Sequence, residues 1–442
     1  MRVLVATAAE KPHFLGMVPL AWALRSAGHE VLVASQPELA TAVTGAGLPF
    51  APVGRDHGYW RMMRAYSLLG VLERETPPFG KADAPEHEVS WEYLLEGYRQ
   101  VVPYWWRMVN DPMADELVDL CRTWKPDLVI WGSVSFAGAV AARACGAAHV
   151  RFIWGADIFA RMRGLFLERM REQPAASRED PLEEWLTGLA GRYGVDFDEE
   201  LVCGQATLDQ VPPALRIPVS ARVPVRYLGM RFVPYNGRAV VPAWLREPLE
   251  RPRVCLTLGT SATDRFGGYT LSVGAVVEAL ADVDAEVVAT VPADRRRGLE
   301  SPPPNVRLVD YVPLHALAAA STATINHGGW GTVLTGLEAG LPQLLVASWF
   351  DNPMLARRLS AQGVALNVPA DEATAERLAE QTRRLLEDTE LRRRARRMGE
   401  EIRSQPPPCS LVAELERLAA ERGSAPRTTV SGTVGAARRG ER

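Results

Sequence analysis

The stretch His327-Gly328-Gly329-Trp330-Gly331-Thr332 decides how the C-terminal half of the chain folds. It follows a short apolar run at residues 322–325 and precedes a predicted helix over residues 332–339. Glycines let the backbone pass close to a ligand because they carry no Cβ, and the free N–H groups at a helix N-terminus attract anions. The stretch therefore predicts a diphosphate site in which His327 donates to a phosphate oxygen. A glycine-rich turn that only lets strand and helix pack closely is the alternative.

Apolar runs that alternate with helical segments indicate two parallel sheets. Residues 2–7 form the first predicted strand, and a helix is expected over about 17–27, with Pro19 near its first turn and Gly28 just past its end. The alternation restarts at Arg253-Val254-Cys255-Leu256-Thr257-Leu258-Gly259. The other predicted strands are residues 30–34, 127–131, 149–154, 286–291, 306–309, 323–325 and 343–346. These patterns predict an α/β protein with two doubly wound, Rossmann-like domains facing a central crevice.

The composition is that of a globular protein without a strong charge bias. A chain of 442 residues suggests two domains. Lys+Arg 50 against Asp+Glu 53 leaves a formal charge of −3, which argues against a nucleic-acid partner. The five scattered cysteines fit reduced thiols better than a disulfide framework or a zinc site. No apolar run is long enough to span a membrane, and the first residues lead into a strand rather than a signal peptide, so a cytoplasmic location is expected.

Changes in composition divide the chain into segments. Proline and arginine are dense before the second half, and the run Pro406-Pro407-Pro408 precedes a last helix. Aromatic residues are dense over about 57–110, which suits an apolar ligand pocket or a partner surface, although helical core packing also explains part of them. The predicted segments are a first domain at 1–225, a linker at 226–252, a second domain at 253–405, a return helix at 406–422 and a disordered tail at 423–442.

Two motifs together resemble a known family. The first is His13-Phe14-Leu15-Gly16-Met17-Val18-Pro19-Leu20-Ala21-Trp22-Ala23-Leu24, and the second is His327-Gly328-Gly329-Trp330-Gly331-Thr332. The pair resembles family 1 glycosyltransferases of the GT-B fold, and within them the actinomycete deoxysugar transferases of macrolide and anthracycline pathways, such as erythromycin desosaminyltransferase. Further matching segments are Ala27-Gly28-His29-Glu30-Val31, Trp124-Lys125-Pro126-Asp127-Leu128-Val129-Ile130-Trp131, Trp154-Gly155-Ala156-Asp157, Glu179-Asp180-Pro181-Leu182-Glu183-Glu184-Trp185-Leu186-Thr187, Pro234-Tyr235-Asn236-Gly237 and Val254-Cys255-Leu256-Thr257-Leu258-Gly259.

The resemblance implies an inverting transfer of a deoxysugar from a TDP-sugar to a hydroxyl of a hydrophobic polyketide aglycone. His13 matches the family's general base, and a helix N-terminus nearby disfavours its protonated form. Many relatives orient this histidine with an acid after the strand that corresponds to residues 127–131. Here Gly132-Ser133-Val134-Ser135 follows, so Asp157 is a candidate substitute, and Ser133 or Ser135 is a candidate hydrogen-bonding partner.

The same resemblance implies an acceptor-binding first domain and a nucleotide-sugar-binding second domain. Relatives often carry an Asp-Gln pair for sugar hydroxyls where this chain has Asp351-Asn352, a departure that is compatible with a deoxysugar. A helix N-cap is the alternative role for Asp351. Val312 and Pro313 match the segment that lies against the nucleotide base. The complete implied donor set is Thr260, Ser261, Val312, Pro313, His327, Gly328, Gly329, Gly331, Thr332, Asp351 and Asn352.

The sequence predicts neither a metal site nor a bound cofactor. Asp282-Val283-Asp284 has the spacing of a metal-binding pair, but it falls at the end of the sheet away from the crevice, and no G-x-G-x-x-G fingerprint follows the first strand. The alternatives are a UDP-sugar-dependent glucosyltransferase acting on another lipophilic acceptor, a sugar-nucleotide epimerase, and a catalytically silent nucleotide-binding module. The resemblance further suggests a cytochrome-P450-like auxiliary protein that docks on residues 57–110.

Overall fold

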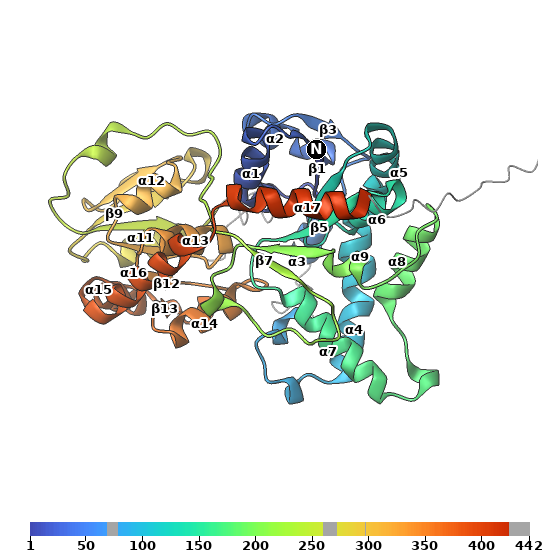
Figure 1. Ribbon diagram of the computed structural model, residues 1–442. Helices are drawn as coiled ribbons and strands as arrows, with labels where there is room; N and C mark the ends of the chain where they lie inside the picture. Colours follow the sequence, from blue (N-terminus) through green and yellow to red (C-terminus); the bar gives the residue numbers. More distant parts are fainter. Residues whose placement is uncertain (69–77, 260–271, 297, 424–442) are drawn as a thin grey trace, which may run out of the picture.

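The computed structural model describes residues 1–68, 78–259, 272–296 and 298–423, which form two α/β domains, each built on an all-parallel sheet (Figure 1). The first sheet has the order β3-β2-β1-β4-β5-β6-β7, and the second has the order β10-β9-β8-β11-β12-β13. The first comprises β1 (Arg2–Ala6), β2 (Glu30–Ser35), β3 (Phe50–Pro52), β4 (Leu128–Gly132), β5 (Ala148–Ile153), β6 (Ala206–Asp209) and β7 (Tyr227–Gly229). The second comprises β8 (Arg253–Thr257), β9 (Glu286–Thr290), β10 (Val306–Val309), β11 (Ala323–Asn326), β12 (Gln343–Leu345) and β13 (Ala365–Asn367).

Helices cover both sheets, as the apolar strands require. Every residue of β4 and β5 is buried, which is the pattern of parallel strands covered on both faces. The helices of the first domain are α1 (Lys11–Ser26), α2 (Ala40–Gly45), α3 (Tyr59–Leu68), α4 (Trp91–Val101), α5 (Arg107–Trp124), α6 (Phe136–Cys145), α7 (Ile158–Glu172), α8 (Pro181–Gly191) and α9 (Glu200–Cys203). Those that follow are α11 (Val273–Ala279), α12 (Leu314–Ala319), α13 (Trp330–Glu338), α14 (Asn352–Ala361), α15 (Ala375–Glu387), α16 (Thr389–Ser404) and α17 (Val412–Gly423).

Helix α1 begins earlier than the sequence pattern predicts. It starts at Lys11 rather than near residue 17, so His13 lies in its first turn and not in the preceding loop. Pro12 supplies the start signal, because proline is tolerated where the helix N–H groups have no partner. Pro19, which suggested the start, lies inside the helix instead. Helix α13 likewise begins at Trp330 rather than at Thr332, which brings its free N–H groups into the glycine stretch.

The predicted linker at 226–252 is partly wrong. Its first residues form β7, which pairs in parallel with β6 and completes the first sheet. Prolines on both sides of this three-residue strand, at 224 and 234, made the segment resemble a linker in sequence. Farther along, Leu245 is buried in an apolar cluster with Val312 and Leu317 of the second domain. The chain thus passes from one domain to the other between Gly229 and Leu245.

The C-terminal helix returns to the first domain. Helix α17 lies across that domain in Figure 1, and Leu415 and Leu418 are buried in the cluster that also holds residues of α1 and β5. Glu414 forms an ion pair with Arg226 at its first turn. The predicted disordered tail lies outside the described residues from 424 onward.

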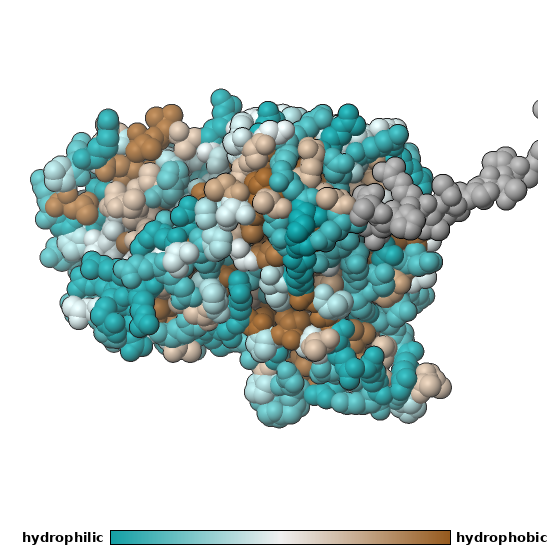
Figure 2. Space-filling view, viewed as in Figure 1, coloured by the Kyte–Doolittle hydropathy of each residue, from teal (hydrophilic) through white to brown (hydrophobic). Residues whose placement is uncertain are grey.

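The aromatic segment over residues 57–110 contributes mainly to the core. Trp91, Tyr98 and Trp106 are buried in the main apolar cluster of the first domain, which is the core-packing interpretation, whereas Tyr104 is 59% exposed. On the face in Figure 2 most of the surface is hydrophilic, and brown residues gather between α14 and α7, beside the join of the two domains. No helix in the described ranges is long and apolar enough to cross a membrane.

Candidate functional site

Each sheet has one point at which the winding of the chain reverses, and the candidate residues lie at these two points. In the first sheet β1 and β4 are neighbours although β2 and β3 come between them in sequence, and His13 follows β1. In the second sheet β8 and β11 are neighbours, and His327 follows β11 directly. Loops at such a reversal diverge to opposite faces and leave room for a ligand beyond the carboxyl ends of the strands.

The imidazole of His13 lies flat on the indole of Trp154. Their ring centroids are 3.7 Å apart and the ring planes differ by only 4°. Trp154 follows β5 and His13 follows β1, so the two rings come from strands of the first sheet that flank β4. Trp154 in turn meets the ring of Phe159 edge to face at 5.4 Å. From the sequence alone, this tryptophan has no predicted role beyond its place in a segment that matches the family.

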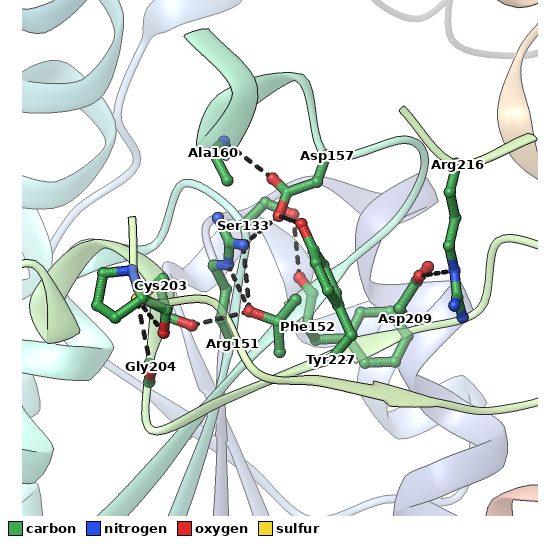
Figure 3. Close-up of polar contacts among 12 residues, drawn as sticks. Ser133, Arg151, Phe152, Asp157, Ala160, Cys203, Gly204, Asp209, Arg216 and Tyr227 are labelled. Atoms are coloured by element: carbon green, nitrogen blue, oxygen red, sulfur yellow. Dashed lines mark hydrogen bonds and ion pairs between the residues drawn. The ribbon is translucent and has the colours of Figure 1, made fainter. Parts of the chain in front are cut away.

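Asp157 anchors the loop that carries Trp154 (Figure 3). Its Oδ1 accepts the backbone N–H of Ala160 at 3.0 Å and caps α7, while its Oδ2 accepts the Tyr227 hydroxyl at 2.9 Å. The same carboxylate is paired with Arg151, and both side chains are buried. The hydrogen bonds of this group therefore go to Ala160, Tyr227 and Arg151. These contacts make Asp157 a loop anchor whose charge is balanced by Arg151 of β5, and its place as the acid partner of His13 stays a prediction.

The serines after β4 also bond to backbone groups. Ser133 donates to the carbonyl of Phe152 at 3.0 Å, and the hydroxyl of Ser135 accepts the N–H of Ala8 at 2.9 Å. A carboxylate without a role in the sequence prediction lies in the β1–α1 loop, directly before α1. Glu10 is 6% exposed, precedes α1, and accepts the indole N–H of Trp60. Its backbone carbonyl receives the N–H of His13 at 3.0 Å, so Glu10 lies one turn before that histidine.

Glycines enclose the imidazole of His327. A Cβ at Gly259 would lie 2.5 Å from its Cε1, and a Cβ at Gly329 would lie 2.5 Å from its Nε2. Burial lowers the pKa of His327 to about 4, and the Thr257 backbone offsets this shift only in part. The imidazole is therefore neutral at pH 7, with a single ring N–H available for donation. No side chain larger than hydrogen fits at either glycine without moving this ring.

The first turn of α13 is open on one side. Gly331 is exposed, and a Cβ added there would meet no atom within 4 Å. Gly328 has a φ of +85° and donates its N–H to Asn326 Oδ1 at 2.9 Å, which holds the turn between strand and helix. Thr332 lies half-buried in the same helical turn. Because the first N–H groups of a helix lack intrahelical acceptors, this turn presents donors toward open space.

The remaining residues of the predicted donor set differ in their contacts and burial. Asp351 precedes α14, but its side chain accepts the indole N–H of Trp330 at 2.7 Å and makes no cap hydrogen bond. Asn352 donates to the carbonyl of His327 at 3.2 Å, so it supports the glycine loop. Val312 and Pro313 are both buried, and their place against the nucleotide base stays a prediction. Thr260 and Ser261 lie outside the described residues.

The two halves of the site touch each other. Gly155, next to Trp154, lies against Trp330: a Cβ there would come within 2.5 Å of the indole atoms Cδ1 and Cε2. Trp330 is 5% exposed and is held by Asp351, whose pKa burial raises to about 6. An ion pair of 2.9 Å between Arg357 and Asp83 joins the domains nearby. Sequence reasoning missed this contact because its partners are far apart along the chain.

Phe350 makes a second contact across the domain boundary. Its ring centroid lies 5.6 Å from that of Trp105 and 5.9 Å from that of Phe79, both in the first domain. Its φ of 54° is in the left-handed region, which is uncommon for a side chain of this size and is found at functional sites. Among the described residues no group of three or more His, Cys, Asp or Glu side chains is arranged to hold a metal ion.

Comparison with known proteins identifies the family. The N-terminal domain model of the erythromycin biosynthesis protein CIII-like family matches residues 22–259, and its C-terminal domain model matches residues 274–418. The chain is 43% identical over 424 residues to the 10-deoxymethynolide desosaminyltransferase of Streptomyces venezuelae, covering 95% of this chain and 98% of the relative. It is also 43% identical over 432 residues to the aklavinone 7-beta-L-rhodosaminyltransferase of Streptomyces galilaeus, covering 95% and 96%.

Solved structures agree with the sequence matches. The glycosyltransferase VinC in complex with dTDP superposes with a TM-score of 0.83 at 38% identity, covering 95% of this chain and all of VinC. The spinosyn forosaminyltransferase SpnP superposes with a TM-score of 0.78 at 35% identity, covering 95% and 99%. The GT-B fold predicted from the sequence is confirmed. The chain is a glycosyltransferase and belongs to the EryCIII-like family.

Proposed function

We propose that the protein transfers a deoxysugar from a TDP-sugar to a hydroxyl group of a hydrophobic polyketide aglycone, with inversion at the anomeric carbon. In this proposal His13 is the general base and the His327–Thr332 stretch binds the diphosphate. The names of similar proteins support the substrate classes, since they include desosaminyl and rhodosaminyl transferases of macrolide and anthracycline aglycones. VinC, which is similar over nearly its whole length, was crystallised with dTDP.

One observation carries the proposal: a chain of direct contacts joins the candidate base to the candidate diphosphate site. His13 stacks on Trp154, the next residue Gly155 packs on Trp330, and Trp330 opens helix α13. A displacement reaction needs its base and its leaving-group site on opposite sides of one sugar. These contacts bring the candidate base and the candidate diphosphate site to the same domain boundary.

The proposed chemistry uses neutral groups and fixed donors. Neutral His13 takes the proton of the acceptor hydroxyl as its oxygen bonds to the anomeric carbon, and the bond from that carbon to the diphosphate oxygen breaks. The charge left on the diphosphate is received by the N–H groups of the first turn of α13 and by the ring N–H of His327, which burial keeps neutral. We propose that the step needs no metal ion, because these donors take the place of a cation.

Aromatic side chains support a lipophilic acceptor. Trp154, Phe159, Trp105, Phe79 and Phe350 form a connected set of ring contacts, from His13 across to the second domain. Such rings offer large apolar area with little loss of side-chain entropy. This set favours a polyketide acceptor over the epimerase alternative, which has no acceptor.

We further propose that a cytochrome-P450-like auxiliary protein docks where residues 57–110 reach the surface. A groove of about 460 Å³ opens beside residues 102–106, with Arg99, Pro103, Arg107, Glu184 and Trp185 among its lining residues. Tyr104, which is exposed, directly follows Pro103 of the groove lining. Equal transfer rates with and without a co-expressed auxiliary protein would remove this part of the proposal.

Transfer assays separate the proposal from its alternatives. TDP-deoxysugars and UDP-glucose would each be offered with a panel of macrolactones and anthracyclinones, and products followed by mass spectrometry and by the anomeric proton coupling. We expect inverted glycosides from TDP donors only, and loss of at least about a hundredfold in kcat for His13→Ala. Products from UDP-glucose alone would favour the glucosyltransferase. TDP binding with no product from any pair, in wild type and His13→Ala alike, would favour the silent module.

A further inference from the structure

We propose that Trp154 is a positioning residue that stabilises the protonated form of His13 through its indole face and so takes over the part that a carboxylate plays in many relatives. The inference rests on the proposed function in that His13 is the base there. No acid follows β4 in this chain, and Asp157 is committed to Arg151, Tyr227 and Ala160. The group that does lie directly on the imidazole is an aromatic ring.

The geometry is suited to this role. At a centroid separation of 3.7 Å and an angle of 4°, the imidazole covers the face of the indole, where the ring quadrupole is negative. A neutral imidazole gains mainly dispersion energy from such a stack. An imidazolium gains cation–π attraction in addition, and tryptophan offers the strongest of the aromatic faces. The stack therefore favours the base after it has taken the proton of the acceptor.

The indole itself is held from several directions. Phe159 contacts it edge to face, Asp157 fixes the end of its loop, and the adjacent Gly155 is pressed against Trp330. Because that last contact comes from the second domain, the loop is fixed by the closed arrangement of both domains. A ring held in this way limits rotation of His13, and orientation of a base is a large part of its effect.

Charged groups around His13 provide the competing explanation. On its own element Lys11 is exposed and Glu10 is buried with its carboxylate on the Trp60 indole. From the neighbouring strand ends come Asp157, paired with Arg151, and Asp209, paired with Arg216. Of these described carboxylates, Glu10 could stabilise an imidazolium through its negative charge, and it must be tested in parallel.

The test measures the titration of His13 directly. Protein with ¹³C-labelled histidine would be titrated by NMR, and His13→Gln would assign its Cε1–H signal among the seven histidines. The variants are Trp154→Phe, Trp154→Leu and Glu10→Gln, together with site-specific replacement of Trp154 by mono- to tetrafluorinated tryptophans, which keep the shape of the ring and progressively weaken its negative face. The pH dependence of kcat/KM would be recorded for the same proteins.

We expect the titration midpoint to fall by about one pH unit for Trp154→Leu, by less for Trp154→Phe, and stepwise with fluorination. The acidic limb of kcat/KM should move with it, and Glu10→Gln should leave the midpoint nearly in place. An unchanged midpoint across the fluorinated series would overturn the proposal, as would a shift confined to Glu10→Gln. The NMR midpoint needs no turnover, so full activity of His13→Gln would refute the base assignment of the proposed function and leave the stacking result standing.

Discussion

Replacing Gly155 by alanine would put a methyl group where the Trp330 ring already lies. The added Cβ would come within 2.5 Å of two carbon atoms of the indole, closer than a Cβ approaches any atom in a relaxed structure. The ring cannot easily yield, since Trp330 is 5% exposed and its indole N–H is held by Asp351 at 2.7 Å. Gly155 does not have a positive φ, so alanine brings no backbone strain and the effect is purely steric.

The magnitude follows from the cost of overpacking. Extra methyl groups in packed sites cost about 1–3 kcal/mol, and because this one lies between the domains, the cost falls on their closed arrangement. We expect kcat/KM of Gly155→Ala to fall by about 5- to 150-fold. Calorimetric affinity for TDP should change less, because the added methyl group meets the indole ring of Trp330 and not the backbone N–H groups of the first turn of α13. Steady-state transfer kinetics and thermal unfolding would be measured side by side.

A matched control and a double-mutant cycle keep the interpretation specific. Gly191→Ala makes the same chemical change at the end of α8, where a Cβ would meet no atom within 4 Å, and it should leave kcat/KM unaltered. Trp330→Phe in the Gly155→Ala background should recover part of the loss, because a smaller ring makes room for the methyl group. Wild-type kcat/KM in Gly155→Ala would refute the view that the Gly155–Trp330 contact is present during turnover.

Three further predictions concern protons and metal ions. Burial lowers the pKa of His327 to about 4, so below pH ~6.5 the unfolded chain takes up a proton that the folded chain does not. As the pH falls from about 6.5 to about 4, the wild type should therefore lose up to about 3 kcal/mol of unfolding free energy relative to His327→Gln. Urea titration of both proteins measures this difference. Burial raises the pKa of Asp351 to about 6, so the wild type loses stability as pH rises from about 4 to about 6. The stability of Asp351→Asn relative to the wild type should therefore increase by up to about 3 kcal/mol over that range. Dialysis against EDTA should leave the transfer rate unchanged, because N–H donors receive the leaving diphosphate.

Each of these has an outcome that counts against it. A stability difference between His327→Gln and wild type that does not vary with pH would show that this imidazole is solvated. The same result for Asp351→Asn would mean that the carboxylate is not buried in solution, and a loss of kcat/KM without a gain in stability would point to contact with the donor sugar. Activity restored after EDTA only by Mg²⁺ or Mn²⁺ would exclude the metal-independent mechanism.

The sequence predicted the features that depend on local pattern. Strand β8 and the glycine stretch at residues 327–332 were identified because apolar runs and glycines have direct conformational meaning. The start of α1 was misplaced because Pro12 and Pro19 both qualify as start signals, and only the packing of the first turn decides between them. Strand β7 is missing from the prediction because a strand of three residues is too short to show a periodic pattern.

The contacts that complete the site could not be predicted in the same way. Trp154 reaches His13 and Gly155 reaches Trp330 only after two sheets have folded and closed on each other. The position of Asp157 near a strand end predicts an acid partner for His13. The sequence pattern does not show that the side chain of Arg151, which lies within β5, forms an ion pair with this carboxylate. Long-range packing, rather than local propensity, determines which of several plausible side chains meets the base.

The most direct test of the account is the affinity of the purified protein for nucleotides, measured by isothermal titration calorimetry with TDP, UDP, GDP, ADP and NAD. It requires no knowledge of the sugar or the aglycone. We predict that TDP binds more tightly than the other four and that His327→Ala weakens its binding by about tenfold or more, as expected for loss of one hydrogen bond to a charged group. Binding of UDP in preference to TDP, or no binding of any of the five, would contradict the account.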